Sequence, residues 1–188
     1  METLQIEKNS CQISLGEYRR EYQDVEKFQG YCAKCRNFGQ QWVCPPFDFD
    51  LNAILDQYSM VDIFGYKMLL PERLLDKKFS MEEQREIGDM YMTQVRAIID
   101  PELWDLEQQY PGSRAFYAGS CHLCDPYKCT RVAEKPAPCR HPLKARNSLE
   151  NFGFDLKRTA EELLDTPMLW GRDGMLPPYY FFIAALMY

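Results

Sequence analysis

Seven of the eight cysteines of this chain fall into two short groups, and this grouping constrains the fold more than any other feature of the sequence. The first group has the spacing C-x2-C-x8-C-P-P and consists of Cys32, Cys35 and Cys44. The second has the spacing C-x2-C-x4-C-x9-C-R-H-P and consists of Cys121, Cys124, Cys129 and Cys139. Such spacing is typical of loops that direct several thiols toward one metal centre, so most of the hydrophobic core must come from the rest of the chain.

The first residues and the net charge of the sequence indicate the expected location and partners of the protein. Residues 1–8 have neither the basic region nor the apolar region of a signal peptide. The longest apolar run, 179–188, is about half the length that a membrane-spanning helix needs. We therefore expect a cytoplasmic protein with no membrane partner, in which grouped cysteines bind metals or carry out redox chemistry. The net charge of −6 disfavours nucleic acid as a partner, because nucleic-acid binding needs a cation-rich surface.

The four cysteines of the second group can all reach one centre, and two metal centres compete for them. Zinc would be held by four thiolates in a structural site, but zinc ribbons use two C-x2-C pairs, whereas nine residues separate Cys129 from Cys139. A cubane iron–sulfur cluster is several ångströms wide and accepts uneven loops, which favours [4Fe–4S] over zinc. Cations lower the pKa of thiols and offset thiolate charge, and those around this group are Lys128, Arg131, Lys135 and Arg140.

The first group supplies only three thiols, so its site is either incomplete or open. Gly39 allows the segment to fold back, and Pro45-Pro46 stiffens the chain that follows. A second [4Fe–4S] cluster here would take its fourth ligand from Cys11, from the second cysteine group, from a non-cysteine group or from an exogenous molecule. In the last case one iron would be free to bind a substrate. The alternative is a zinc site that is completed by His122 or His141.

These two motifs are followed by the pattern Arg146-x-Ser148-x-Glu150-x-x-Gly153-x-Asp155. The combination resembles a prokaryotic family of predicted metal-binding proteins of unknown function, common in anaerobes, and the resemblance spans residues 31–155. It implies that the seven grouped cysteines are the ligands. The sequence departs from the family pattern at Asn147, where proline is usual. Ser148 and Glu150 are candidates for a polar site beside a cluster, although a loop that ends in a helix cap explains them equally well.

The remaining sequence predicts a single domain, residues 1–188, with cysteine-rich loops at 31–46 and 119–142. Buried strands are expected at 60–70, 114–119 and 179–186. Helices are expected at 51–58, 81–98, 101–109 and 156–164. Asp50 marks the start of the first helix, and the Ser80–Glu83 capping box marks the start of the second. Pro101 suits the first turn of the third. The pattern indicates an α/β or α+β fold with a small sheet of about three or more strands and metal-bearing loops at its edge. Both loops border the same sheet, so the two cysteine groups should lie close in space.

Three functions from different classes follow from these features. The leading hypothesis is a soluble iron–sulfur protein with two clusters that transfers electrons or takes part in redox chemistry in an anaerobe, with a redox protein as its partner. The second is an enzyme whose open iron at the three-cysteine site binds a substrate. The third is an interaction module that is stabilised by zinc. Sequence alone leaves open which of the three applies.

Overall fold

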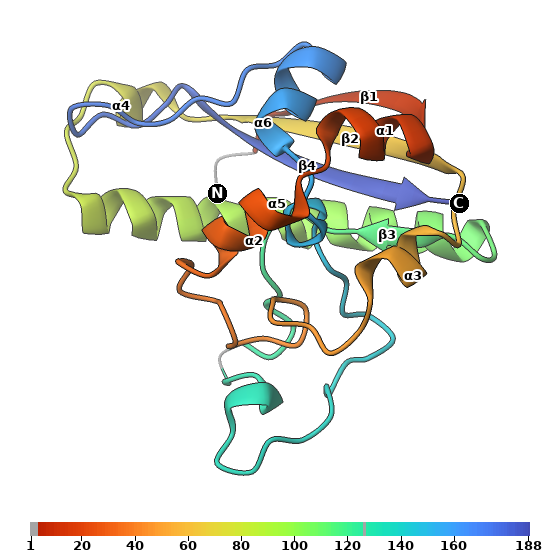
Figure 1. Cartoon of the computed structure of the whole chain (residues 1–188). Helices are drawn as coiled ribbons and strands as arrows, with labels where there is room; N and C mark the ends of the chain where they lie inside the picture. Colours follow the sequence, from red (N-terminus) through yellow and green to blue (C-terminus); the bar gives the residue numbers. More distant parts are fainter. Residues whose placement is uncertain (1–3, 126) are drawn as a thin grey trace.

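A four-stranded antiparallel sheet forms the centre of the protein (Figure 1). The computed structural model describes residues 4–125 and 127–188. The strand order is β1-β2-β4-β3, and the strands are β1 (Ile6–Ser14), β2 (Met60–Leu69), β3 (Arg114–Phe116) and β4 (Tyr179–Met187). The fold is α+β, because all neighbouring strands are antiparallel and helices cover the sheet. This confirms the predicted class.

Strand β4 lies between β2 and β3, with Leu69 opposite Tyr179 and Phe116 opposite Ala185. Alternate side chains of β4 enter two different hydrophobic clusters, one on each face of the sheet. A strand that is buried on both faces needs apolar residues at every position. The unbroken apolar run at the end of the sequence is therefore the central strand of the sheet.

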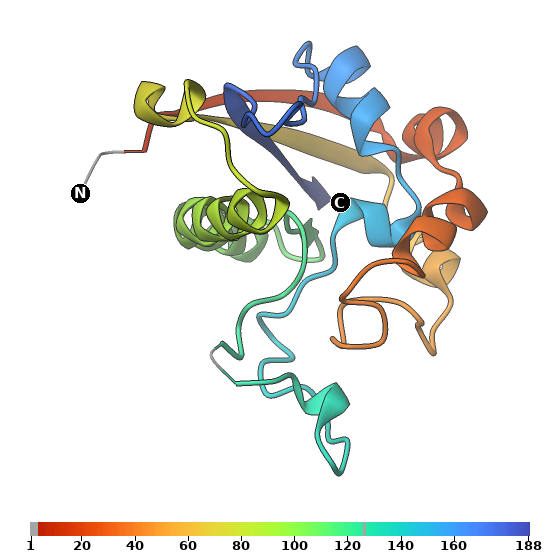
Figure 2. The ribbon, with the colours of Figure 1, turned by 90° about the vertical axis from the view of Figure 1, so that its left-hand side faces the viewer.

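One face of the sheet is covered by several short helices (Figure 2). These are α1 (Leu15–Tyr22), α3 (Leu51–Leu55), the 3-10 turn η2 (Leu149–Phe152), and α6 (Leu156–Arg158), which continues as the π-helical turn η3 (Thr159–Leu163). Tyr18 is fully buried here, with its ring stacked on Phe154 and its hydroxyl 2.9 Å from the Thr159 hydroxyl. Asp50 caps α3 by accepting a hydrogen bond from the Asn52 amide, as the sequence predicts.

A single long helix, α5 (Met81–Gln109), covers the other face of the sheet. Its capping box is present as predicted, but the helix continues through Pro101 for 29 residues, so the expected separate helix at 101–109 is wrong. The reason is that the buried stripe is continuous across Pro101: Val95 and Ile99 before it and Leu103 after it all pack on the sheet. Burial of such side chains contributes about 1.5–3 kcal/mol each, which outweighs the one backbone hydrogen bond that proline removes.

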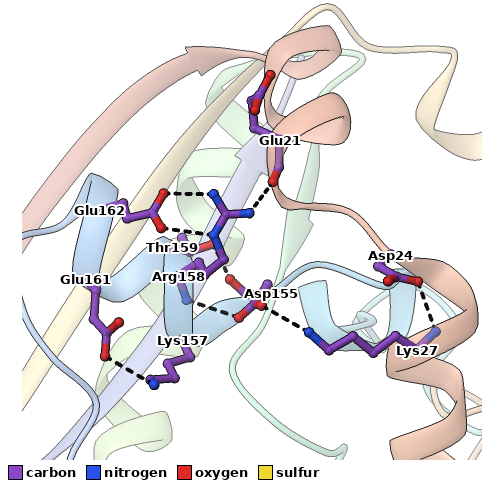
Figure 3. Close-up of polar contacts among 9 residues, drawn as sticks. All are labelled: Glu21, Asp24, Lys27, Asp155, Lys157, Arg158, Thr159, Glu161 and Glu162. Atoms are coloured by element: carbon purple, nitrogen blue, oxygen red, sulfur yellow. Dashed lines mark hydrogen bonds and ion pairs between the residues drawn. The ribbon is translucent and has the colours of Figure 1, made fainter.

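Polar contacts hold the first two helices against α6 (Figure 3). Asp155 caps α6 by accepting from the Arg158 amide and pairs with Lys27 of α2 (Val25–Cys32) over 3.7 Å. Arg158 donates to Glu162 over 2.9 Å and to the carbonyl of Glu21 over 2.5 Å. The Lys27–Asp155 pair thus connects α6 to α2, which ends at Cys32, and the Arg158–Glu21 bond connects α6 to α1.

The elements that were not predicted from the sequence include β1, α1 and α2. Strand β1 is an edge strand whose side chains are mostly exposed, so its sequence has no strong apolar alternation. The capping residues of the two helices are nevertheless present: Ser14 accepts from the Glu17 amide and Asp24 from the Lys27 amide. One further short helix, α4 (Glu72–Leu75), follows β2. In the described part of the chain, no helix is long and apolar enough to cross a membrane.

Candidate metal centre

The two cysteine segments lie side by side at one end of the molecule, at the bottom of the views in Figures 1 and 2. The first segment leaves the end of α2 at Cys32 and continues to α3. The second leaves the edge strand β3 and reaches Cys121 shortly afterwards. The fold thus brings together two segments that are far apart in sequence. Whether these loops bind a metal, as the sequence predicts, depends on their side chains.

The four cysteines of the second group line one cavity of about 290 Å³. Trp42 and Val43 of the first segment and His141 also line it, so the cavity is bounded by both segments. All eight cysteines are free thiols. Within residues 4–125 and 127–188, no three histidine, cysteine, aspartate or glutamate side chains are arranged to hold a metal ion. The thiols of the second group line this cavity, and such soft sulfur donors are ligands that zinc and iron–sulfur clusters share.

The second segment is folded around Thr130, which is buried although most of its neighbours are exposed. The Thr130 hydroxyl donates to the carbonyl of Pro138 over 3.0 Å, and the Thr130 carbonyl accepts from the Ala137 amide over 3.2 Å. Next to this turn, the amide of His141 donates to the sulfur of Cys139 over 3.3 Å. Thr130 therefore sets the path of the chain between Cys129 and Cys139.

Arg131 joins the two segments. Its Nη1 donates to the carbonyls of Gln41 and Cys44 over 2.7 and 2.6 Å, and its Nη2 donates to that of Pro46 over 2.5 Å. The guanidinium also lies 5.5 Å from the centre of the Trp42 ring. Arg131 was expected to act on the thiols of its own segment, but its donors bind backbone carbonyls of the other segment.

Gln41 forms a second link between the segments. Its Oε1 accepts from the Cys121 amide and its Nε2 donates to the Cys121 carbonyl, both over 2.9 Å. The same Oε1 accepts from the thiol of Cys44 over 3.8 Å. The prediction that the two cysteine groups lie close in space is confirmed by these contacts. Sequence reasoning missed Gln41, because a lone glutamine between cysteines carries no recognisable signal.

The three cysteines of the first group are held by a tight loop. Gly39 has a φ of 69°, and its amide donates to the Pro45 carbonyl over 2.8 Å, so the segment folds back as predicted. Cys44 is buried, Cys32 is half-buried and Cys35 is exposed. Burial raises the pKa of Cys44 to about 12, and the charges of the other two thiols and of Glu150 and Cys121 act in the same direction. Burial thus disfavours the thiolate form of Cys44, and a bound cation would offset this effect.

Two buried asparagines fix this loop to the body of the protein. Asn147 and Asn151 both donate from Nδ2 to the carbonyl of Val43, over 2.9 and 2.8 Å. Asn151 also accepts from the thiol of Cys32 over 3.9 Å, and Asn147 accepts from Arg114 over 3.0 Å. Asn147 is the position where the resembled pattern has proline, and its side chain makes two bonds that proline could not make.

Ser148 and Glu150 lie next to these asparagines. The Oγ atom of Ser148 and the Oε2 atom of Glu150 are buried, and neither makes a hydrogen bond with the described residues. Burial raises the pKa of Glu150, while its own backbone amide, the nearby Ser148 hydroxyl and the charge of Arg96 oppose the shift. Both residues lie at the turn η2 with Asn151, whose side chain contacts the thiol of Cys32, and their role beside a cluster stays a prediction.

Helix α5 supplies a cation that the sequence did not indicate. Arg96 is buried, pairs with Asp100 over 2.8 Å and donates to the carbonyl of Ser120, next to Cys121. Burial raises the pKa of Cys121, and the positive charge of Arg96 counteracts this shift. His122 faces Asp100 in a neighbouring cavity of about 270 Å³, and burial lowers its pKa. Because Arg96 lies in the middle of a helix, only the tertiary structure places it near the thiols.

Cys11 is not brought to the other cysteines. It lies on β1 opposite Ile63, packs against the hydrophobic cluster of the sheet, and its thiol contacts the carbonyl of Gln12 over 3.7 Å. Strand β1 and the cysteine segments are at opposite ends of the molecule in both views (Figures 1 and 2). The expectation that Cys11 provides the fourth ligand of the first group thus has no support in this geometry.

Comparison with known proteins gave one match. The sequence model of a family described as "Predicted metal-binding protein (DUF2284)" matches residues 19–183, which is most of the chain and includes both cysteine groups. No curated protein and no solved structure matched the chain.

Proposed function

The chain belongs to the DUF2284 family of predicted metal-binding proteins, and on this premise we propose that it is an iron–sulfur protein that transfers electrons. The observation that carries the proposal is that Cys121, Cys124, Cys129 and Cys139 all line one cavity. Four soft donors around a cavity of about 290 Å³ suit a [4Fe–4S] cluster better than a zinc ion, which needs every sulfur at about 2.3 Å from one point.

Such a cluster supplies one-electron transfer when it is bound, with a potential set by charge, hydrogen bonding and burial. The residues of this chain contribute to all three. The His141 amide donates to Cys139, Arg96 places a positive charge near Cys121, and the Trp42 ring covers part of the cavity. The three thiols of the first group, Cys32, Cys35 and Cys44, would hold a second cluster. The Gln41 side chain contacts both groups, so the two clusters would be neighbours.

The partner in this proposal is a redox protein with a basic docking surface. The chain has a net charge of −6, and opposite charges accelerate the association of electron-transfer partners.

The test is metal and acid-labile sulfide analysis of protein that has been purified without oxygen. Two clusters predict about eight irons and about eight sulfides per chain. Cys121→Ser should remove about half of both and weaken the visible absorption, because a serine oxygen is a poor substitute for a thiolate. Cys11→Ser is the matched control and should change neither value, since Cys11 lies on β1.

Two outcomes would contradict the proposal. Stoichiometric zinc without sulfide would indicate a structural zinc site and a module without redox chemistry. Iron and sulfide that cannot be reduced reversibly, with a spectrum that shifts when small ligands are added, would indicate an enzyme with an open iron.

A further inference from the structure

Glu150 differs from the other buried acidic residues of the described chain in the hydrogen bonding of its carboxylate. Its Oε2 is buried without a hydrogen-bond partner, and no other carboxylate oxygen in the described residues is in that state. Glu107 pairs with Arg146 over 2.7 Å and also accepts from the Ala115 amide, and Asp100 pairs with Arg96. Burial of an ionisable oxygen without a partner is costly, and the cost is relieved by protonation of the carboxyl, by an ordered water, or by an ion or ligand in the place of the partner.

The thiols of the first cysteine group lie beside the turn that carries Glu150, because the next residue, Asn151, accepts from the thiol of Cys32 over 3.9 Å. Asn147 and Asn151 also donate to the carbonyl of Val43, which precedes Cys44. A carboxylate and thiolates gathered in this way repel one another unless a cation lies among them. The same cation would satisfy the free carboxylate oxygen and the three thiolates.

The local structure keeps Glu150 in this position. The next residue, Asn151, contacts the thiol of Cys32 and the carbonyl of Val43, which precedes Cys44. On the other side of the turn, the carbonyl of Gly153 accepts from the Asp24 amide over 2.8 Å, at the start of the helix that ends in Cys32. The turn η2 that carries Glu150 is thus tied both to α2 and to the loop of Cys44.

We propose that Glu150 is the fourth protein ligand of the metal centre formed by Cys32, Cys35 and Cys44. The proposal rests on the function proposed above, and it specifies a centre with three sulfur donors and one oxygen donor. Carboxylate is a harder ligand than thiolate and binds iron less tightly in a cluster, so the iron at Glu150 would be the one most easily lost or exchanged. The fourth position is then filled by the chain, without Cys11 and without an exogenous ligand.

The experiment compares the wild type with Glu150→Gln, Glu150→Cys and Glu161→Gln, all prepared without oxygen and enriched in ⁵⁷Fe. Iron and sulfide are counted, and the iron sites are resolved by Mössbauer and electron paramagnetic resonance spectroscopy. Glu161→Gln is the matched control, because it makes the same change of carboxylate to amide on η3, where Glu161 pairs with Lys157 at the surface. Circular dichroism checks that each variant is folded.

The wild type should contain one iron site with a spectrum distinct from that of irons with only sulfur ligands. Glu150→Gln should lose about one iron of the roughly eight expected for two clusters and give the signal of a three-iron cluster when oxidised. Glu150→Cys should keep the full iron count but lose the distinct site, and Glu161→Gln should match the wild type. An intact iron count with an unchanged spectrum in both Glu150 variants would overturn this inference and leave the proposed function standing. A wild type without sulfide would overturn both.

Discussion

We call the sheet with its helices the body, and the two cysteine segments at 33–49 and 119–146 the cysteine lobe. These two regions are stabilised in different ways. The body buries two hydrophobic clusters, one on each face of the sheet. In the described residues of the cysteine lobe the buried side chains are Val43, Cys44, Pro45 and Thr130. The lobe is instead held by hydrogen bonds from the side chains of Gln41, Arg131, Asn147 and Asn151 to backbone carbonyls.

This difference indicates how the two regions depend on a metal. Hydrophobic burial supplies most of the stability of a folded domain, and the body has it without any ligand. Hydrogen bonds contribute only about 0.5–1.5 kcal/mol each on a net basis, so a lobe built from them is only weakly stable alone. Metal binding by thiolates is coupled to local folding, and we expect it to add the missing stability to the lobe and little to the body.

The largest effect is expected in the body. Ile99→Ala should lower the free energy of unfolding by about 2–5 kcal/mol, because this fully buried side chain of α5 packs on the sheet and its loss leaves a cavity. Chemical denaturation measures the change. The matched control is Ile98→Ala, whose side chain is 42% exposed, and it should change stability by less than about 0.5 kcal/mol. Equal losses for both variants would mean that this face of α5 is not part of the core.

The next effect lies at the junction between the two regions. Gly153 has a φ of 87°, and a Cβ there would lie 2.7 Å from the Cα of Val25 in α2. Gly153→Ala should cost about 2 kcal/mol or more, because the left-handed conformation alone costs about 1–2 kcal/mol and α2 would have to move. Hydrogen exchange should then increase in both α2 and the lobe.

Gly16→Ala is the control for this change, since nothing lies within 4 Å of a Cβ at that position in α1. It should stabilise the protein by about 0.5–1 kcal/mol, because alanine favours a helix over glycine. A neutral Gly153→Ala would show that α2 is free to shift away from η2.

A smaller effect should be confined to the lobe. Arg131→Ala removes three bonds to the carbonyls of the first segment and should reduce the local stability of that segment by about 1–2 kcal/mol. Hydrogen exchange of the backbone amides of residues 41–44 should become faster, while the global unfolding transition moves little. Lys135→Ala removes the same charge from an exposed position of the lobe and should leave the exchange unchanged. A shift of the global transition by Arg131→Ala would contradict the independence of the two regions.

The smallest effect is a pH dependence of the body. The amide and side chain of Ser80 bond to Glu83 in the capping box of α5, and these hydrogen bonds lower the pKa of Glu83. Because the pKa is lowered in the folded state, the stabilisation is present above the ordinary glutamate pKa of about 4.3 and is lost as the pH falls through the lower folded value. Glu83→Gln should flatten this part of the pH–stability curve, whereas Glu82→Gln should not. If the pH–stability curves of Glu83→Gln and Glu82→Gln were parallel, the stabilising role of the Glu83 hydrogen bonds would be refuted.

Much of the body could be predicted because its signals are local. The Asp50 cap, the Ser80–Glu83 capping box and the apolar runs of β2 and β4 all mark their elements correctly. The prediction was wrong at Pro101, where packing on the sheet outweighs the local signal to start a new helix. It missed β1, because an exposed edge strand needs few apolar residues and derives its structure from pairing with β2.

Cysteine spacing shows which thiols can be brought together through short loops, and it thereby indicated the donor set of the candidate centre. The sequence also indicated Ser148 and Glu150 as polar neighbours. The distant groups that join the thiols were placed by tertiary packing, which brought Gln41 against Cys121, directed Arg96 from α5 toward the same cysteine, and left Cys11 on β1. Spacing controls contacts within a loop, whereas contacts between loops depend on how the sheet and helices pack.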